Sequence, residues 1–147
     1  MTPAAQIAAA LARRFEGMYL TPYLCPAGRA TIGFGATYYE DGTKVTLMDA
    51  PITRERAEEL LLWMVETVYL PAVRLLCPNV TDPKRQAALI DFVFNLGTGR
   101  LKTSTLRKRV LAQDWGAVPS EIKKWDIAAG RKLRGLTIRR AAEADLI

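Results

Sequence analysis

The sequence of 147 residues contains no histidine. This absence excludes the Ser-His-Asp triad, the Cys-His dyad and the usual His-ligated zinc sites. Any chemistry therefore has to use carboxylates, thiols, lysines, phenols or hydroxyls. Cysteine is scarce as well, because Cys25 and Cys77 are too few for a disulfide scaffold, and the sequence leaves open whether these two residues pair.

Long apolar runs are also missing. None approaches the roughly 18 residues that a membrane-spanning helix needs. The N-terminal residues MTPAAQ do not begin a basic segment followed by an apolar one. We therefore expect a protein that is made in the cytoplasm without an encoded export signal, and that is not stably inserted in a membrane.

What the sequence does contain is an ordinary globular composition, with half of its residues hydrophobic, and an excess of positive charge. The 21 basic and 15 acidic residues give a net charge of +6. Such a charge favours a polyanionic partner, for example nucleic acid, an anionic cell envelope or a lipid headgroup surface. The length predicts one domain that spans residues 1–147.

The first part of the chain predicts one helix followed by a small β-rich segment. Thr2-Pro3 is typical of a helix start, and Ile7, Leu11 and Phe15 form an apolar stripe at helical spacing. Gly17 is expected to end this helix. Residues 18–50 lack helical periodicity, and we predict a strand over residues 31–37 and a hairpin turn over residues 40–43.

From residue 51 onward the pattern is helical. Thr53 is expected to cap a long amphipathic helix that bends or ends near Pro71, and Asp82-Pro83 is expected to begin a helix that runs to Asn95. Shorter helices are predicted over residues 105–113, capped by Ser104, around 120–125 and over 136–146. The predicted class is α+β and mostly α: a β-rich lobe at about 18–50, and a helical lobe of about 51–147 plus the N-terminal helix.

Glu16 is a candidate general acid on physical grounds. It falls in the last turn of the predicted first helix, where a carboxylate faces the negative end of the helix dipole. That position raises a carboxyl pKa, as an acid working near neutral pH requires, although the neighbouring Arg13 and Arg14 oppose the shift. A solvated surface glutamate is the alternative interpretation.

The segment Thr31-Ile32-Gly33-Phe34-Gly35 is predicted to form a strand. One face of this strand presents the Thr31 hydroxyl beside the two glycines, which have no side chains. Glycine in a strand often marks the close approach of a ligand, so we predict that Gly33 contacts substrate; a short, twisted hairpin with loose glycines is the alternative interpretation. Cys25 lies in the preceding turn between Leu24 and Pro26, where a thiol is expected to be partly exposed and able to act as a base, a nucleophile or a water-positioning group.

Taken together, Glu16, Cys25 nine positions later and Thr31 six positions after that resemble the catalytic segment of phage lysozymes, the endolysins of glycoside hydrolase family 24. The resemblance extends over nearly the whole chain. It includes the segments FNLGTG and STL, from Phe94 and Ser104 respectively, and a C-terminal pattern of Trp125, Gly130-Arg131, Gly135-Leu136, Arg139-Arg140 and Glu143.

The resemblance implies a lysozyme-like fold and cleavage of the β-1,4 bond between N-acetylmuramic acid and N-acetylglucosamine in peptidoglycan. It makes Glu16 the general acid, and it gives Cys25 and Thr31 the place of the family's water-holding pair. Because the family more commonly has Asp where this chain has Cys25, the stereochemical outcome stays open. No metal and no organic cofactor is implied.

The resemblance also implies weaker site residues. Tyr23, Asn95 and Ser104 fall in segments that line the groove in the family, and their ordinary interpretations are an aromatic packed at a hairpin base, a residue at a helix C-terminus and a helix N-cap. We expect one arginine of a C-terminal cluster to pair with Glu16, without deciding which; the candidates are Arg131, Arg134, Arg139 and Arg140. Three tryptophans are expected to anchor the core: Trp63, Trp115 and Trp125.

Three other functions compete. A lytic transglycosylase would keep Glu16 and release anhydro-sugars, and the missing aspartate leaves it open as the alternative to a hydrolase. A nucleic-acid-binding protein would use the arginines but would leave Glu16 and Thr31 without a role. An inactive wall-binding module would tolerate the loss of Glu16. The resemblance favours a monomeric lysozyme that meets the cell wall in the periplasm after another protein has opened the membrane, with peptidoglycan and not nucleic acid as its partner.

Overall fold

A computed structural model describes all residues from 1 to 147. Its helices and strands follow one another as α1 (Pro3–Phe15), β1 (Tyr19–Leu24), β2 (Ala30–Gly33), α2 (Arg54–Met64), the π-helical turn η1 (Val65–Tyr69), α3 (Leu70–Leu76), α4 (Pro83–Leu96), α5 (Thr98–Lys102), α6 (Thr105–Leu111), α7 (Val118–Lys123), β3 (Ile127–Ala128), β4 (Arg131–Lys132) and α8 (Arg134–Ala144).

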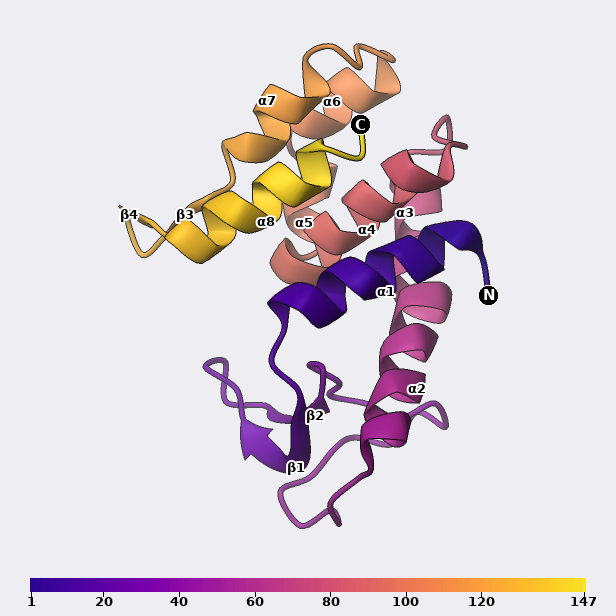
Figure 1. The fold of residues 1–147 in the computed structure, drawn as a ribbon, viewed down its shortest axis with the longest axis vertical. Coiled ribbons are helices and arrows are strands. Elements are labelled where there is room, and N and C mark those ends of the chain that lie inside the picture. The colour runs from indigo at the N-terminus through magenta and orange to yellow at the C-terminus, as the bar shows by residue number, and fades with distance from the viewer.

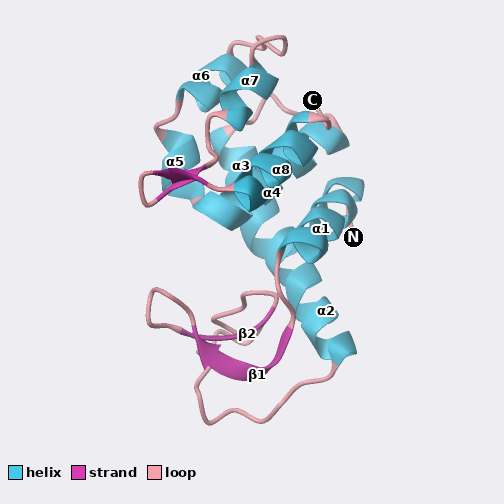
Figure 2. Ribbon diagram, turned by 60° about the vertical axis from the view of Figure 1, so that its left-hand side comes forward, coloured by secondary structure: helices cyan, strands magenta, loops and turns pink.

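Figures 1 and 2 show two lobes that α2 connects. The helical lobe gathers α1 and the helices from α4 to α8, and the smaller lobe holds the antiparallel pair β1–β2 with its loops. The predicted class, α+β and mostly α with a lysozyme-like arrangement, is confirmed. The chain leaves α1 directly into β1, so the end of α1 lies where the two lobes meet (Figure 1).

The starts of α1, α2, α4 and α6 follow from side-chain capping. In each case a hydroxyl or carboxylate oxygen accepts a hydrogen bond from the backbone N–H three residues later, which satisfies one of the amide groups that a helix leaves free at its first turn. All four caps predicted from the sequence are confirmed at distances of 2.9–3.2 Å: Thr2, Thr53, Asp82 and Ser104.

The core is built around α4. Every residue from Gln86 to Val93 is buried, which is the state of a helix covered on all sides, here by α1, α3 and α8. The face of α1 that packs on it is made of alanines: Ala4, Ala5, Ala8, Ala9 and Ala12. The predicted stripe of Ile7, Leu11 and Phe15 is only half-buried, because small alanine side chains let the two helices approach more closely.

The predicted strand over residues 31–37 is wrong in its second half. Strand β2 ends at Gly33, and the chain reverses through Phe34 and Gly35 so that Ile32 bridges Ala36. Gly33 has φ +66° and Gly35 has φ +101°, backbone angles that favour glycine and that interrupt the alternation of a strand. The two glycines therefore form a tight hairpin rather than a flat strip. The following turn at residues 40–43 is confirmed by the bridge between Tyr38 and Lys44.

The long helix after Thr53 does not simply end at Pro71. It widens into the π-helical turn over Val65–Tyr69 and continues as α3, with Pro71 in the first turn of α3. Two further elements were not predicted, the short helix α5 and the ribbon β3–β4. The three tryptophans are partly buried and pack against the core, as expected.

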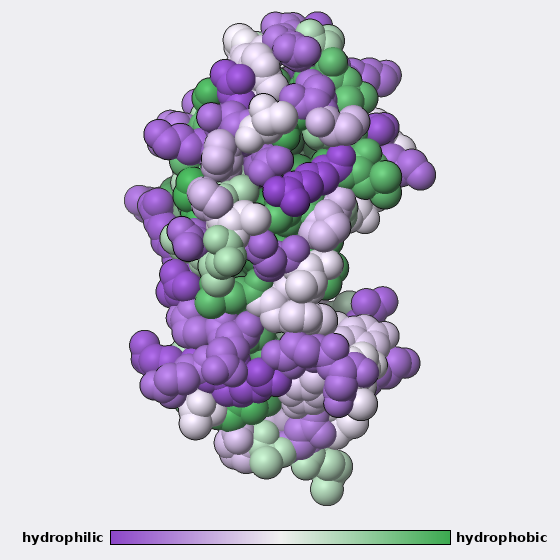
Figure 3. Space-filling model, turned by 90° about the vertical axis from the view of Figure 1, so that its right-hand side faces the viewer, coloured by the Kyte–Doolittle hydropathy of each residue, from purple (hydrophilic) through white to green (hydrophobic).

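None of the helices combines the length and the apolar character that crossing a membrane would require. On the face of the molecule in Figure 3, hydrophilic side chains interrupt the hydrophobic ones throughout and crowd a band across the lower part. Both cysteines are free thiols; Cys25 is half-buried and Cys77 is fully buried.

Candidate active site

Glu16 stands at the junction between the helical lobe and the β-lobe. It follows the last residue of α1 and adopts an extended backbone, while its N–H still donates to the Ala12 carbonyl over 2.8 Å. The Tyr19 ring lies over the next residue, Gly17, where a Cβ would come within 2.9 Å of the ring and would displace it. The chain therefore turns sharply out of the helix and leaves the Glu16 side chain 28% exposed.

Arg139 is the arginine that pairs with Glu16. Its Nη1 donates to Glu16 Oε1 over 2.7 Å, whereas the nearer Arg13 pairs with Glu58 and Arg14 lies over the Phe15 ring. The Oε2 atom of Glu16 has no hydrogen-bond partner in the protein. One carboxylate oxygen is thus fixed and the other is left available.

Arg139 is itself held by a fully buried carboxylate. Asp91 on α4 accepts two hydrogen bonds of 2.8 Å from Nε and Nη2 of Arg139, whose side chain is 4% exposed. Burial works to lower the pKa of the Arg139 guanidinium, but the hydrogen bonds and charges of Asp91 and Glu16 outweigh it and raise that pKa. The guanidinium is therefore a fixed positive charge that orients Glu16.

Cys25 and Thr31 lie together on the β-lobe. The register of the sheet pairs Leu24 with Ala30 and Tyr23 with Thr31, which brings the turn after β1 against the start of β2. The pKa of the Cys25 thiol is lowered, chiefly by a hydrogen bond from the Arg29 backbone and also by one from the Thr31 side chain, against an opposing effect of burial. Thr31 is buried, and its hydroxyl donates to the Arg29 carbonyl over 3.0 Å.

Tyr23 links these residues with Glu16. Its pKa is raised first by burial, and then by the negative charges that Tyr19, Cys25 and Glu16 can carry. Glu16 also contributes to raising the pKa of Tyr69, where burial is the main cause. Tyr23 is therefore close enough to both Glu16 and Cys25 to respond to the charge of each.

A cavity of about 370 Å³ opens beside Glu16 on the helical side; its lining residues are Phe15, Glu16, Asn95, Leu133, Gly135, Leu136 and Arg139. Asn95 was predicted as a substrate contact, and its buried Oδ1 has no hydrogen-bond partner. Cys25, Thr31 and Tyr23 are not part of this lining. The structure thus places Asn95 with Glu16 in the cavity, and the other three on the β-lobe.

Two predicted substrate contacts lie elsewhere. Gly33 is buried against Ala57 of α2, and its φ of +66°, an angle that L side chains rarely adopt, is what favours glycine at this position of the hairpin. Ser104 is 6% exposed, and its hydroxyl is used twice within the helical lobe, as acceptor from the Arg107 N–H and as donor to the Leu101 carbonyl over 2.7 Å. Both have structural roles instead of a place in the cavity.

The sequence reasoning missed Asp91 and the residues Leu133, Gly135 and Leu136. Asp91 stands inside the apolar run Ala87–Phe94 of α4, and a carboxylate within such a run is the signal that could have identified it as a partner of a distant arginine.

Comparison with known proteins agrees with this arrangement. The sequence profile of the family described as Phage lysozyme matches residues 13–143. The endolysin of Acyrthosiphon pisum secondary endosymbiont phage 1 is 35% identical over 143 residues, which cover 92% of this chain and 91% of that protein. The SAR-endolysin of Escherichia phage Mu is 35% identical over 135 residues, or 87% of this chain and 71% of that protein.

The solved structure of the endolysin of the Escherichia coli phage FAHEc1 superimposes with a TM-score of 0.79 at 31% identity, and the alignment covers 96% of this chain and 90% of that one. The profile match runs from the last turn of α1 to the buried Glu143 of α8, and so includes Glu16, Asp91 and Arg139. The agreement of profile, relatives and fold leads to one conclusion: the chain belongs to the phage lysozyme family.

Proposed function

We propose that this protein is an endolysin that degrades peptidoglycan by hydrolysing the β-1,4 bond between N-acetylmuramic acid and N-acetylglucosamine, with Glu16 as the general acid. The observation that carries the proposal is the state of the Glu16 carboxyl group. Arg139 holds Oε1 at 2.7 Å, and Oε2 is left without a protein partner beside a cavity of about 370 Å³. An oriented carboxyl with one available oxygen can deliver a proton along a defined direction.

In the proposed reaction, the protonated Glu16 donates its proton from Oε2 to the glycosidic oxygen, and the bond between this oxygen and the anomeric carbon breaks. A water molecule supplies the new oxygen on that carbon. The Thr31 hydroxyl and the Cys25 sulfur hold this water, and the thiolate accepts the proton that the water loses. The lowered pKa of Cys25 supports this role, because a larger fraction of the thiol is then ionised.

We assign two further residues to substrate contact. Asn95 lines the Glu16 cavity with a half-buried side chain, which can contact a sugar hydroxyl or an N-acetyl group there. Tyr23 lies between the acid and the thiol, and its ring stacks against Tyr19 with a centroid separation of 4.2 Å. This arrangement gives the sheet side of the site an aromatic surface.

The proposed place of action is the cell wall, which the protein reaches as a monomer after synthesis in the bacterial cytoplasm. Relatives that carry the name SAR-endolysin support an action outside the cytoplasm. The net charge of +6 favours association with an anionic envelope.

The test compares the native protein with Glu16→Gln on purified peptidoglycan. Gln keeps the shape of the side chain and has no acidic proton, so we expect a loss of activity of about 10²–10⁴-fold. Glu55→Gln is the matched control, because Glu55 is exposed on α2 and has no hydrogen-bond or ion-pair partner. Equal rates for the native protein and Glu16→Gln would reject the assignment of the acid.

The chemical nature of the products decides between hydrolysis and transglycosylation. Hydrolysis leaves a reducing N-acetylmuramic acid end, which borohydride reduces, whereas transglycosylation leaves a 1,6-anhydro end that resists reduction. The thiol in place of the family's usual aspartate is the observation that keeps transglycosylation as the second candidate. Products with anhydro ends alone would replace the hydrolase by a lytic transglycosylase that uses the same Glu16.

A further inference from the structure

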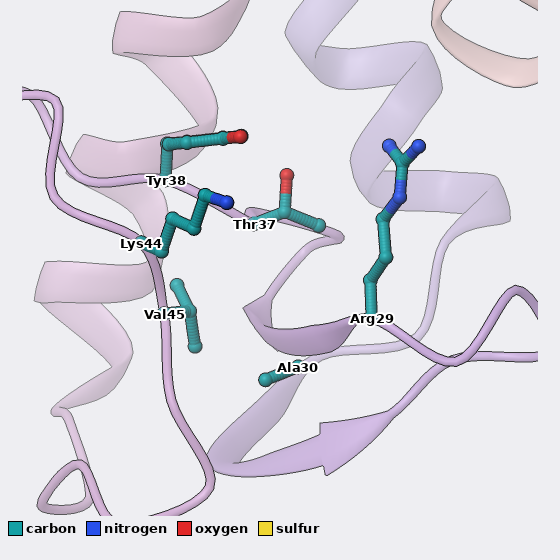
Figure 4. Close-up of a pocket in the computed structure, with 6 residues that line it drawn as sticks. All are labelled: Arg29, Ala30, Thr37, Tyr38, Lys44 and Val45. Carbon is teal, nitrogen blue, oxygen red and sulfur yellow. The ribbon is translucent and has the colours of Figure 1, made fainter.

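A second cavity, of about 300 Å³, lies on the β-lobe outside the residues assigned above (Figure 4). The start of β2 forms one side of it and the hairpin of residues 37–45 forms the other. The bridge between Tyr38 and Lys44 and the 2.9 Å bond from the Val45 N–H to the Thr37 carbonyl hold this hairpin. The lining residues are Arg29, Ala30, Thr37, Tyr38, Lys44 and Val45.

The four polar side chains of this cavity have no partners in the protein. Arg29 and Lys44 form no ion pair, and neither the Thr37 nor the Tyr38 hydroxyl makes a hydrogen bond. No carboxylate is among the lining residues, and the two acids of the same hairpin are engaged elsewhere, Glu40 with Arg56 and Asp41 with Thr43. The polar ends of these side chains lie on the same side of the hairpins (Figure 4).

This donor set defines the chemistry of a ligand. Arginine and lysine donate hydrogen bonds and accept none, and the two hydroxyls add donors that can turn towards an oxygen. The hydroxyls can also accept, but a neutral sugar would leave both positive charges without a counter-charge, so it is a poorer match than an anion. A carboxylate accepts from all four groups and neutralises part of the charge.

The cavity adjoins the candidate active site on two sides. The Arg29 carbonyl accepts hydrogen bonds from the Thr31 hydroxyl and the Cys25 N–H, and the Arg29 charge contributes to lowering the pKa of Cys25. Thr37 and Tyr38 also line a narrow neighbouring cavity of about 110 Å³ together with Tyr69, the residue whose pKa responds to Glu16. A ligand in the cavity that Arg29 and Lys44 line therefore lies beside the glycan strand that occupies the candidate active site.

We propose that the Arg29–Lys44 cavity binds a carboxylate of the peptide that branches from the glycan strand of peptidoglycan, and so contributes to the choice of substrate. The inference rests on the proposed function. In this polymer, carboxylates are carried by the peptides, which are attached to the muramic acid residues next to the bond that is cleaved. The cavity thus favours strands whose peptides carry free carboxylates over strands whose peptides carry amides.

The test is the double variant Arg29→Gln/Lys44→Gln, assayed on intact peptidoglycan and on peptidoglycan whose peptide carboxylates have been converted to amides with a carbodiimide and ammonia. We expect KM on intact peptidoglycan to rise roughly 3- to 30-fold with kcat unchanged, because two partly solvated ion pairs are lost. On the amidated peptidoglycan the double variant and the native protein should have equal rates. The matched control is Arg74→Gln/Lys108→Gln, which removes two exposed, unpaired charges from α3 and α6 and should change neither assay by more than a small factor.

The two proposals fail in different ways. If the native protein cleaves neither substrate, the proposed function is wrong. If the native protein cleaves both substrates, and the double variant is slowed by the same factor on both or is not slowed on either, the peptide assignment is wrong. Binding of the free stem tetrapeptide, measured by calorimetry, adds a second readout. The tetrapeptide should bind to the Glu16→Gln variant, and it should bind more weakly to the variant that combines Glu16→Gln, Arg29→Gln and Lys44→Gln. If inorganic phosphate displaces the tetrapeptide at equal concentration, the cavity is a general anion site and the peptide assignment is overturned.

Discussion

Arg139 on the last helix donates a hydrogen bond of 2.7 Å to Glu16 at the end of the first helix, across 123 positions of sequence. The same guanidinium is anchored by two bonds to Asp91 on the central helix. The position of the candidate acid therefore depends on three helices at once. Residues far from any substrate can alter the rate through this connection.

Replacing Arg139 by Lys should separate orientation from charge. A lysine keeps the positive charge, but its single ammonium cannot make the paired bonds to Asp91 and reach Glu16 as well. We expect kcat on peptidoglycan to fall by up to about 100-fold with a small change in KM, because the acid loses its fixed direction. Steady-state rates on purified peptidoglycan measure this.

The control for this substitution is Arg134→Lys, in the first turn of the same helix, because Arg134 is exposed and forms no ion pair. Its kinetic constants should stay at the native values. Full activity in Arg139→Lys would show that the ion pair does not orient Glu16.

Replacing Asp91 by Ala should destabilise the fold strongly. The substitution leaves the buried Arg139 with Glu16 as its only remaining ion-pair partner and removes two charge-assisted hydrogen bonds. We expect the free energy of unfolding to fall by about 3–5 kcal/mol, as for other buried ion pairs that lose one partner. Urea unfolding followed by circular dichroism measures it, and Asp145→Ala, at an exposed position after α8, is the control. A loss below about 1 kcal/mol would mean that water replaces the carboxylate.

The two cysteines should differ sharply towards iodoacetamide. Hydrogen bonds from Arg29 and Thr31 lower the pKa of Cys25, so that at a given pH more of this half-buried thiol is ionised. Burial raises the pKa of Cys77 to about 11 and removes it from solvent. At about pH 8 the native protein should therefore take up one label, on Cys25, with loss of activity.

Mass spectrometry of the labelled peptides checks this result. In urea both cysteines should react, and Cys25→Ser should take up no label in the native state. Labelling of Cys77 at the rate of Cys25 would contradict the buried position of its thiol.

Local signals predicted a large part of the fold. Each of the four N-caps depends on one side chain and an amide three residues away, so neighbouring residues contain the whole interaction. The end of β2 was mispredicted because the alternation of Thr31, Gly33 and Gly35 is compatible with both a strand and a hairpin. Only the positive φ angles of the two glycines distinguish them.

The residues of the candidate site also fall into two groups, those that local sequence predicts and those that depend on how the helices pack. Glu16, Cys25 and Thr31 lie within 16 consecutive positions, so their spacing in the sequence identifies them as one motif. The partner of Glu16 could not be chosen among four arginines, because that choice depends on how α8 packs on α4. Asp91 decides it, since a buried carboxylate attracts the arginine that can reach it without leaving the core.

Glu143 should make the stability of the fold depend on pH. It is fully buried on α8, and burial together with the neighbouring Asp91 raises its pKa to about 9, against the opposing charges of Arg140 and Arg139. Three carboxyls, those of Glu16, Asp91 and Glu143, share two guanidinium groups here, so a proton on Glu143 balances the cluster. Because the folded state then binds more protons than the unfolded state, the stability that Glu143 contributes is greatest below the ordinary glutamate value of 4.5 and falls as the pH rises towards 9. We expect a slope of up to about 1.4 kcal/mol per pH unit, measured by urea unfolding at about pH 5, 7 and 8.5. In Glu143→Gln this part of the slope should disappear, whereas the exposed control Glu55→Gln should keep it. If the free energy of unfolding instead changes with pH in the same way in the native protein and in Glu143→Gln, Glu143 is ionised in the folded state and paired with Arg140.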